Sequence, residues 1–160
     1  MDLIKITELL KFDANYERLV SEIMKGKPET RVQIIDEAVP FFTASLWKDL
    51  QMPILLICPS PEHSRRLHDY LSAWMGSEAK PLRFGESEIL PYERLTEDLS
   101  TSRERLNTLG SLVKNNSEPL IVVTSASALT QKTISIKSFK ENSFSYVQGD
   151  KVNLEEMLNY

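Results

Sequence analysis

The sequence predicts an α/β fold with a doubly wound, mostly parallel sheet and helices on both faces, followed by the start of a second α+β domain. Continuous apolar runs at 54–58 and 120–124 are typical of central strands of a parallel sheet, buried on both faces. Segments with helical periodicity alternate with these runs through short connections. Such strand–helix–strand alternation favours a doubly wound layer.

The composition indicates one globular domain with a proper core. The 160 residues are 41% apolar and 26% charged, which are ordinary globular values. A net charge of −4 argues against a non-specific nucleic-acid binder, which needs surplus Lys and Arg. Cys58, the only cysteine, lies in an apolar run and is predicted to be a small buried hydrophobe. No run approaches the roughly 18 apolar residues of a membrane span, so we expect a cytoplasmic protein without a membrane partner.

Capping residues and glycines predict the helix ends of the first half. Asp13 is a good N-cap for a helix in the first 25 residues, and a second helix is predicted over Glu37–Leu50. Ser60 and Pro61 suit the start of a third helix, which Gly76 ends.

The second half begins with Leu82–Phe84, a weaker strand candidate. Thr101–Glu104 has the spacing of a capping box and predicts a helix start. The predicted buried stripe of that helix consists of Leu106, Leu109, Leu112 and Val113. From residue 140 the pattern changes: 143–148 alternates like a half-exposed strand, and Asn153 is a candidate helix cap. We therefore expect a domain boundary between residues 139 and 140.

The chain shows no residues arranged for catalysis, for a cofactor or for a metal. It contains neither Gly-x-x-x-x-Gly-Lys-Ser/Thr nor Gly-x-Gly-x-x-Gly, the loops that cradle phosphates. Asp36 and Glu37 resemble the metal-holding end of an ATPase strand, but without a phosphate loop Asp36 is better explained as a helix cap. His63 and His68 are five residues apart and do not share a helical face, so we expect them to be solvated.

Arginines provide the densest basic positions of the sequence. They form a candidate interaction surface of Arg65, Arg66, Arg103 and Arg105. These arginines can also be explained without a binding role, as exposed side chains that form ion pairs with Asp69 or Glu104 on a helix surface.

Three stretches, in this order, resemble the front of bacterial transcription-repair coupling factors. The first runs over residues 55–62, followed by Arg66-Leu67 and Tyr70-Leu71, and the third covers 121–131. The second stretch lies between these two and is the most specific. In that family a Leu-Pro-Tyr-Asp/Glu turn precedes a helix that contains Arg-Leu. Its signature residues here are Leu90, Pro91, Tyr92, Glu93, Arg94, Arg103, Glu104, Arg105 and Leu106.

The resemblance implies a fold and a role. Residues 1–139 would form a degenerate RecA-like domain, similar to the excinuclease protein UvrB but without its nucleotide site. Residues 140–160 would begin the domain that binds the excinuclease protein UvrA, mainly through residues beyond 160, and so bring repair to a stalled RNA polymerase. RNA polymerase and DNA would be contacted by other domains of the parent. ATP and Mg²⁺ would serve its downstream DNA translocase, so this segment is not expected to be an enzyme.

Two other functions compete with this interpretation. An active nucleotide-dependent enzyme, such as a helicase half, is disfavoured by the missing phosphate loop. A stand-alone α/β domain that binds a small metabolite at the carboxyl ends of its strands stays open. Composition and periodicity by themselves support only a soluble α/β domain.

Overall fold

The computed structural model describes residues 3–86, 99–114, 119–144, 148–149 and 151. The elements follow one another in the order η1 (Leu3–Phe12), α1 (Ala14–Met24), η2 (Asp36–Ala38), α2 (Val39–Leu50), β1 (Ile54–Cys58), α3 (Pro61–Met75), β2 (Leu82–Phe84), α4 (Leu99–Val113), β3 (Ile121–Ser125), α5 (Ala126–Thr130) and α6 (Ile136–Glu141), where η denotes a 3₁₀ helix. No helix in these described ranges has both the length and the apolar character required to cross a membrane.

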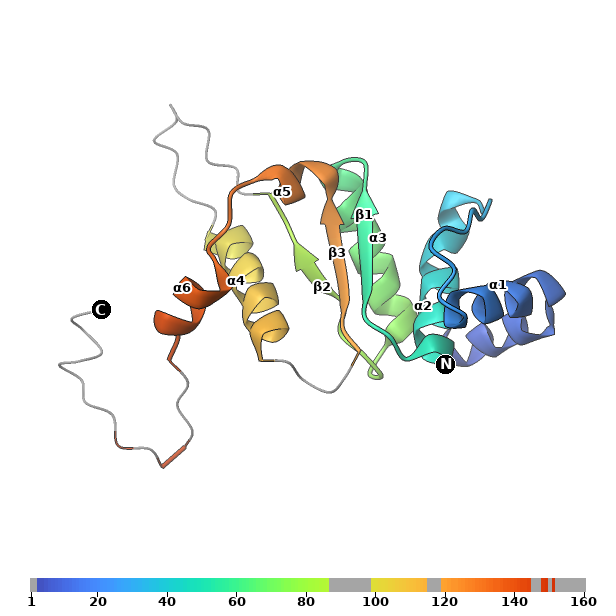
Figure 1. Ribbon diagram of the computed structural model, residues 1–160, viewed down its shortest axis with the longest axis horizontal. Coiled ribbons are helices and arrows are strands. Elements are labelled where there is room, and N and C mark those ends of the chain that lie inside the picture. Colours follow the sequence, from blue (N-terminus) through green and yellow to red (C-terminus); the bar gives the residue numbers. More distant parts are fainter. Residues whose placement is uncertain (1–2, 87–98, 115–118, 145–147, 150, 152–160) are drawn as a thin grey trace.

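Three parallel strands form the sheet in the order β1-β3-β2 (Figure 1). In the register, Leu56 pairs with Val123, and Val123 pairs on its other side with Arg83. The α/β class and the parallel sheet are thus confirmed. The second apolar run forms its strand one residue later than predicted, at Ile121–Ser125.

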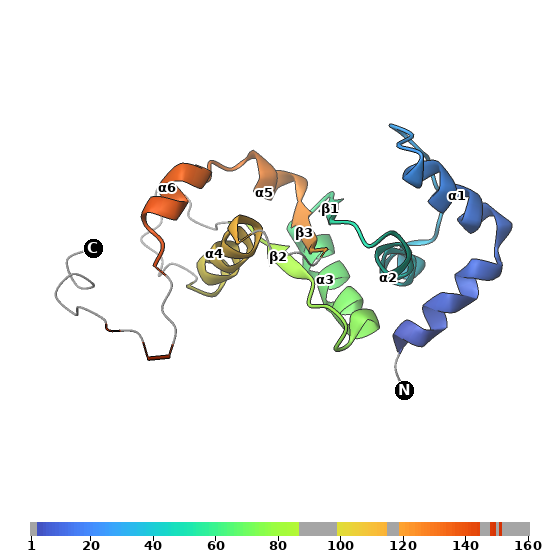
Figure 2. The ribbon, with the colours of Figure 1, turned by 60° about the horizontal axis from the view of Figure 1, so that its bottom comes forward.

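One face of the sheet is covered by α3, with α2, η1 and α1 packed beyond it (Figure 2). The buried core on this side comprises Ile4, Ala44, Trp47, Cys58, Leu71, Met75, Ile121 and Val123. Ring contact between Phe41 and Trp74, with centroids 5.1 Å apart, joins α2 to α3. The indole of Trp47 donates a hydrogen bond of 2.8 Å to the carbonyl of Pro119 and so ties α2 to the start of β3.

The opposite face of the sheet is covered only in part. Leu109 of α4 and Ala128 of α5 pack here against Val122 and Phe84, which belong to β3 and β2. On β1, however, Leu55 is 55% exposed and Ile57 is 57% exposed. The prediction that Ile54–Cys58 is buried on both faces is therefore wrong for this face. An apolar run shows that a strand can be buried, but a neighbouring element must supply the cover.

Local capping chemistry places several helix ends as predicted. The carboxylate of Asp13 accepts hydrogen bonds from the N–H groups of Asn15 and Tyr16 and so begins α1. Ser60 caps α3 in the same way, and Gly76 follows that helix with φ +56°, a conformation that favours glycine. Asp36, in contrast, does not cap α2. It lies in η2, and Ala38 stands at the N-cap without a side-chain bond.

Helix α4 differs from its prediction at its start and in its buried face. It begins at Leu99, so Thr101 lies within the helix and is 6% exposed rather than leading a capping box. Leu106 and Leu112 are more than half exposed, whereas Thr108 is buried and donates to the carbonyl of Arg83. The predicted stripe is thus wrong at Leu106 and Leu112, because α4 meets the polar backbone end of β2, whereas Leu109 packs against the core as predicted.

The region around the expected domain boundary forms a short helix. Ser135 caps α6, which runs to Glu141 and so crosses residue 140. Of the strand predicted over 143–148, Ser143, Phe144 and Gln148 are described, and they are not in a strand. The remainder of that segment and Asn153 lie outside the described residues.

Candidate functional site

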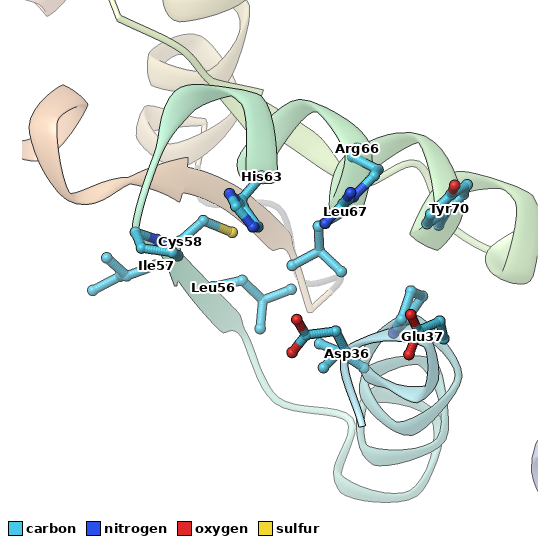
Figure 3. Close-up of a pocket in the computed structure, with 12 residues that line it drawn as sticks. Asp36, Glu37, Leu56, Ile57, Cys58, His63, Arg66, Leu67 and Tyr70 are labelled. Atoms are coloured by element: carbon cyan, nitrogen blue, oxygen red, sulfur yellow. The ribbon is translucent and has the colours of Figure 1, made fainter. Parts of the chain in front are cut away.

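A cavity of about 410 Å³ lies at the carboxyl end of β1 (Figure 3). Three segments enclose it: the end of β1, the η2–α2 corner and the first turns of α3. Its lining residues are Asp36, Glu37, Val39, Pro40, Leu56, Ile57, Cys58, Pro59, His63, Arg66, Leu67 and Tyr70. Crevices at the carboxyl ends of parallel strands are the usual binding positions of open α/β sheets.

The sequence of α3 explains which of its side chains reach the cavity. His63, Arg66, Leu67 and Tyr70 are spaced by three, four and seven residues, which places them on one side of a helix. The capping bond of Ser60 starts α3 directly after β1, and this short connection brings His63 close to Cys58. The hydroxyl of Ser60 also lies 2.7 Å from His63 Nδ1, which holds the imidazole at the mouth of the cavity.

The cavity joins an apolar floor to a rim that carries charges of both signs. Leu56, Cys58 and Leu67 form part of the floor. In Figure 3 the carboxylates of Asp36 and Glu37 lie across from His63 and Arg66 on α3. Such a lining suits a ligand with an apolar body and polar groups at its ends.

The start of α3 differs from a phosphate cradle. Pro59 and Pro61 carry no N–H group. The N–H of His63 donates to the Ser60 hydroxyl at 3.3 Å, so the capping side chain occupies it. A cradle requires several backbone N–H groups turned toward the phosphates.

Asp36 and Glu37 are brought to the cavity mouth, but not into a metal cluster. Within the described ranges, no three His, Cys, Asp or Glu residues lie close enough together to hold an ion. Cys58, which forms part of the floor, is otherwise buried in the core, as predicted, and burial raises the pKa of its thiol. That shift favours the protonated, unreactive form.

The two histidines have different environments. His63 is exposed at the cavity mouth. His68 is half-buried, and its Nε2 lies 3.1 Å from the carbonyl of Pro81, with Nδ1 3.2 Å from Asp69. The expectation of a solvated His68 is therefore wrong, because the segment before β2 passes over the helix there.

The structure separates the arginines of the candidate interaction surface. Arg65 and Arg66 are exposed on α3, and Arg66 lines the cavity. Arg103 is exposed on α4, which packs against β2 instead. The pairing suggested for Glu104 also differs, since its partner is Arg83 of β2.

Arg105 is engaged within the fold. Its guanidinium lies 4.0 Å from the centre of the Phe84 ring and donates to the carbonyl of Gly85 at 2.6 Å. It also donates to the side-chain oxygen of Gln131 at 3.3 Å. The Arg105 cluster, meaning these four residues, joins α4 to the end of β2 and to the segment after α5. Arg105 lies 20 or more positions from each of its three partners along the chain, so no local sequence signal could have found the cluster.

Other residues of the predicted signature have simpler positions. Leu106 is exposed on α4, and Arg103 and Glu104 lie in its second turn. The turn from Leu90 to Arg94 falls outside the described residues.

Comparison with known proteins found no match to this chain among family models, curated proteins or solved structures. The functional interpretation therefore depends on the residues themselves.

Proposed function

We propose that this chain is the front module of a transcription-repair coupling factor, acting as a scaffold that helps to recruit the excinuclease protein UvrA to a stalled RNA polymerase. In this proposal the sheet belongs to a doubly wound, degenerate RecA-like domain in the cytoplasm. ATP hydrolysis and DNA translocation belong to other parts of the parent. UvrA is bound mainly through residues beyond 160.

The Arg105 cluster is the observation that carries this proposal. Two of the segments that resemble the family, residues 103–106 of the second stretch and the third stretch at 121–131, are separated along the chain. Arg105 of the former donates a hydrogen bond to Gln131 of the latter, and the same guanidinium also donates to the carbonyl of Gly85 at the end of β2. A shared structural unit gives a physical reason for these residues to occur together. It therefore supports interpreting the two stretches as one signature.

The turn after β1 supports a scaffold rather than a nucleotide-hydrolysing role. Prolines flank Ser60, and the hydroxyl of that serine uses the N–H of His63. We expect no tight binding of ATP, because backbone donors for its phosphates are lacking at this turn. Calorimetric titration with ATP and Mg²⁺ tests this. Micromolar binding that disappears in Asp36→Ala would contradict it and restore the ATPase interpretation of Asp36 and Glu37.

Recruitment of UvrA can be tested by pull-down with two forms of the protein. One form is the 160-residue chain, and the other is extended by about sixty residues, roughly the smallest domain that holds a core. We expect only the extended form to retain UvrA, because a standard interface buries about 800 Å² on each side. If neither form binds, the family assignment is wrong.

Equal binding by both forms would instead place the contact on the α/β part of the protein. Charge substitutions at Arg65, Arg66 and Arg103 are then the first variants to measure, since these side chains are exposed. Arg105→Lys serves as the comparison, because Arg105 is engaged inside the fold. Duplex DNA binding is expected to be weak at physiological salt, given the net charge of −4.

A second candidate function is binding of a small metabolite in the cavity at the end of β1. The specific observation that favours it is the apolar floor with Asp36 and Glu37 facing His63 and Arg66. Ligand-observed NMR with a library of small zwitterions tests this function. A hit that is lost in Arg66→Ala but kept in the matched surface variant Arg65→Ala would favour it over the scaffold role.

A further inference from the structure

We infer that the outer edge of β1, which pairs with no other strand in the described part of the chain, is a docking site for one extended peptide strand, supplied by a partner protein, which adds to the sheet as a fourth strand. Strand addition at β1 does not depend on the repair assignment. It follows from the backbone, the exposed side chains and the cavity that meet at this edge.

The backbone of β1 has hydrogen-bonding groups directed away from the sheet. β1 is the outer strand of the described sheet and pairs with β3 alone. The N–H of Ile54 donates to the carbonyl of Leu120, the residue directly before β3, so it points toward β3. Because the direction of the N–H and C=O groups alternates along a strand, Leu56 and Cys58 also face β3. The groups of Leu55 and Ile57 therefore point to the open edge, at the spacing that a further strand requires.

The same two residues expose their side chains. Leu55 and Ile57 are each more than half exposed on the face that α4 and α5 leave open. The strand carries no charge, proline or bulge in Ile54–Cys58, the features that usually protect an edge from pairing. An edge with this composition is suited to accept another strand.

The cavity defines the other side of an added strand. It borders β1 at Leu56–Pro59 and is floored by Leu67 of α3. Alternate side chains of an added strand would enter it, while the others would cover Leu55 and Ile57. A strand would thus use both the cavity and the exposed leucine–isoleucine pair, whereas a small molecule in the cavity would leave the second surface bare.

The η2–α2 corner selects a single strand over a second copy of this chain. The cavity is lined by Asp36, Glu37, Val39 and Pro40 as well as by β1, so the η2–α2 corner faces β1 across the cavity and forms a wall there (Figure 3). Pairing β1 with β1 of another copy would bring the two walls against each other. An isolated extended segment avoids this obstruction. Polar side chains of the segment that enter the cavity would meet the carboxylates of Asp36 and Glu37 and the guanidinium of Arg66, which line it.

Hydrogen exchange measured by NMR on the 160-residue chain tests the proposal. The probe is a peptide copying Pro119–Ser125 with a lysine tail, because β3 already pairs with β1 at its other edge. We expect saturating peptide to slow exchange of the Leu55 and Ile57 amides by at least about tenfold. The Leu56 and Cys58 amides, already bonded to β3, are the internal control. The control peptide carries proline in place of both Val122 and Val123 and is expected to have no effect.

Two protein variants separate strand addition from other binding. Ile57→Pro removes an outward N–H that the β1–β3 ladder does not use, so binding is expected to disappear while Val123 stays protected. If that variant does not fold, Leu55→Lys places a charge on the exposed edge and is expected to weaken binding at least about tenfold.

Three results would overturn the proposal. One is less than about twofold protection of Leu55 and Ile57 at millimolar peptide. Another is protection that rises with protein concentration in the absence of peptide, which would identify a second copy as the occupant. The last is a response confined to His63 and Arg66, which would indicate a small-ligand pocket.

Discussion

Removing the Arg105 side chain is the sharpest test of how the second half of the chain is held together. Arg105→Ala deletes the hydrogen bond to the buried carbonyl of Gly85, the bond to Gln131 and the stacking on Phe84. Hydrogen bonds from a charged donor contribute about 1.5–3 kcal/mol. A partly desolvated cation–π contact adds about 1 kcal/mol. Because such contributions are not additive, we expect the free energy of unfolding to fall by about 2–4 kcal/mol.

Urea denaturation followed by circular dichroism measures this loss. With a slope of about 2 kcal/mol per molar, the midpoint is expected to fall by about 1–2 M. Arg103→Ala is the matched control, since Arg103 is exposed on the same helix, and is expected to change stability by less than about 0.5 kcal/mol. Arg105→Lys keeps the charge without the planar group and is expected to lie between the two. If Arg105→Ala is as mild as Arg103→Ala, the Arg105 cluster does not hold α4 to β2.

Further measurements address the caps, the core and the pH dependence. Ser60→Ala is expected to cost about 1 kcal/mol through loss of the α3 cap, while Ser60→Gly costs only a few tenths; equal losses would contradict the capping role. Leu71→Ala should lower the free energy of unfolding by about 2–5 kcal/mol, because Leu71 is fully buried, and Leu106→Ala by less than about 0.5 kcal/mol, because Leu106 is exposed. If Leu106→Ala lowers the free energy of unfolding as much as Leu71→Ala does, Leu106 is buried, as the leucine spacing of α4 predicted. Burial and the hydrogen bond to Asp49 raise the pKa of Tyr16, so this tyrosine stabilises the fold below its unfolded pKa of about 10 and the contribution falls as the pH rises above that value. The alkaline fall in the urea midpoint should therefore be shallower in Tyr16→Phe, and an unchanged slope would refute the assignment.

The elements that the sequence predicted well depend on short-range chemistry. The apolar run Ile54–Cys58, the Ser60 cap and Gly76 each act within a few residues, and all three occupy the predicted positions. The cavity was foreseen only as a general possibility at the strand ends. Asp36 and Glu37 reach it from a separate part of the chain, and their meeting with His63 depends on how α2 packs against α3.

Predictions about faces were less successful, because a face is defined by its neighbour. Leucine spacing in α4 indicated an apolar stripe, yet Leu106 and Leu112 are exposed. Beside Leu109, it is Thr108 and Arg105 that meet the end of β2, and both donate to backbone carbonyls. Leu55 and Ile57 have the same apolar character as Ile121 and Val123. They remain exposed because the helices on their side of the sheet cover β2 and β3 instead.

Periodicity and capping are properties of consecutive residues, so the amino-acid sequence was sufficient to predict the α/β class, the parallel strands and the caps of α1 and α3. Tertiary packing, in contrast, places Arg105 among Phe84, Gly85 and Gln131 and makes β1 the outer strand of the sheet in the described residues. Both features depend on how distant segments are arranged. Whether an apolar strand is covered, or an arginine finds acceptors, depends on which elements pack beside it, and no local pattern in the chain encodes that choice.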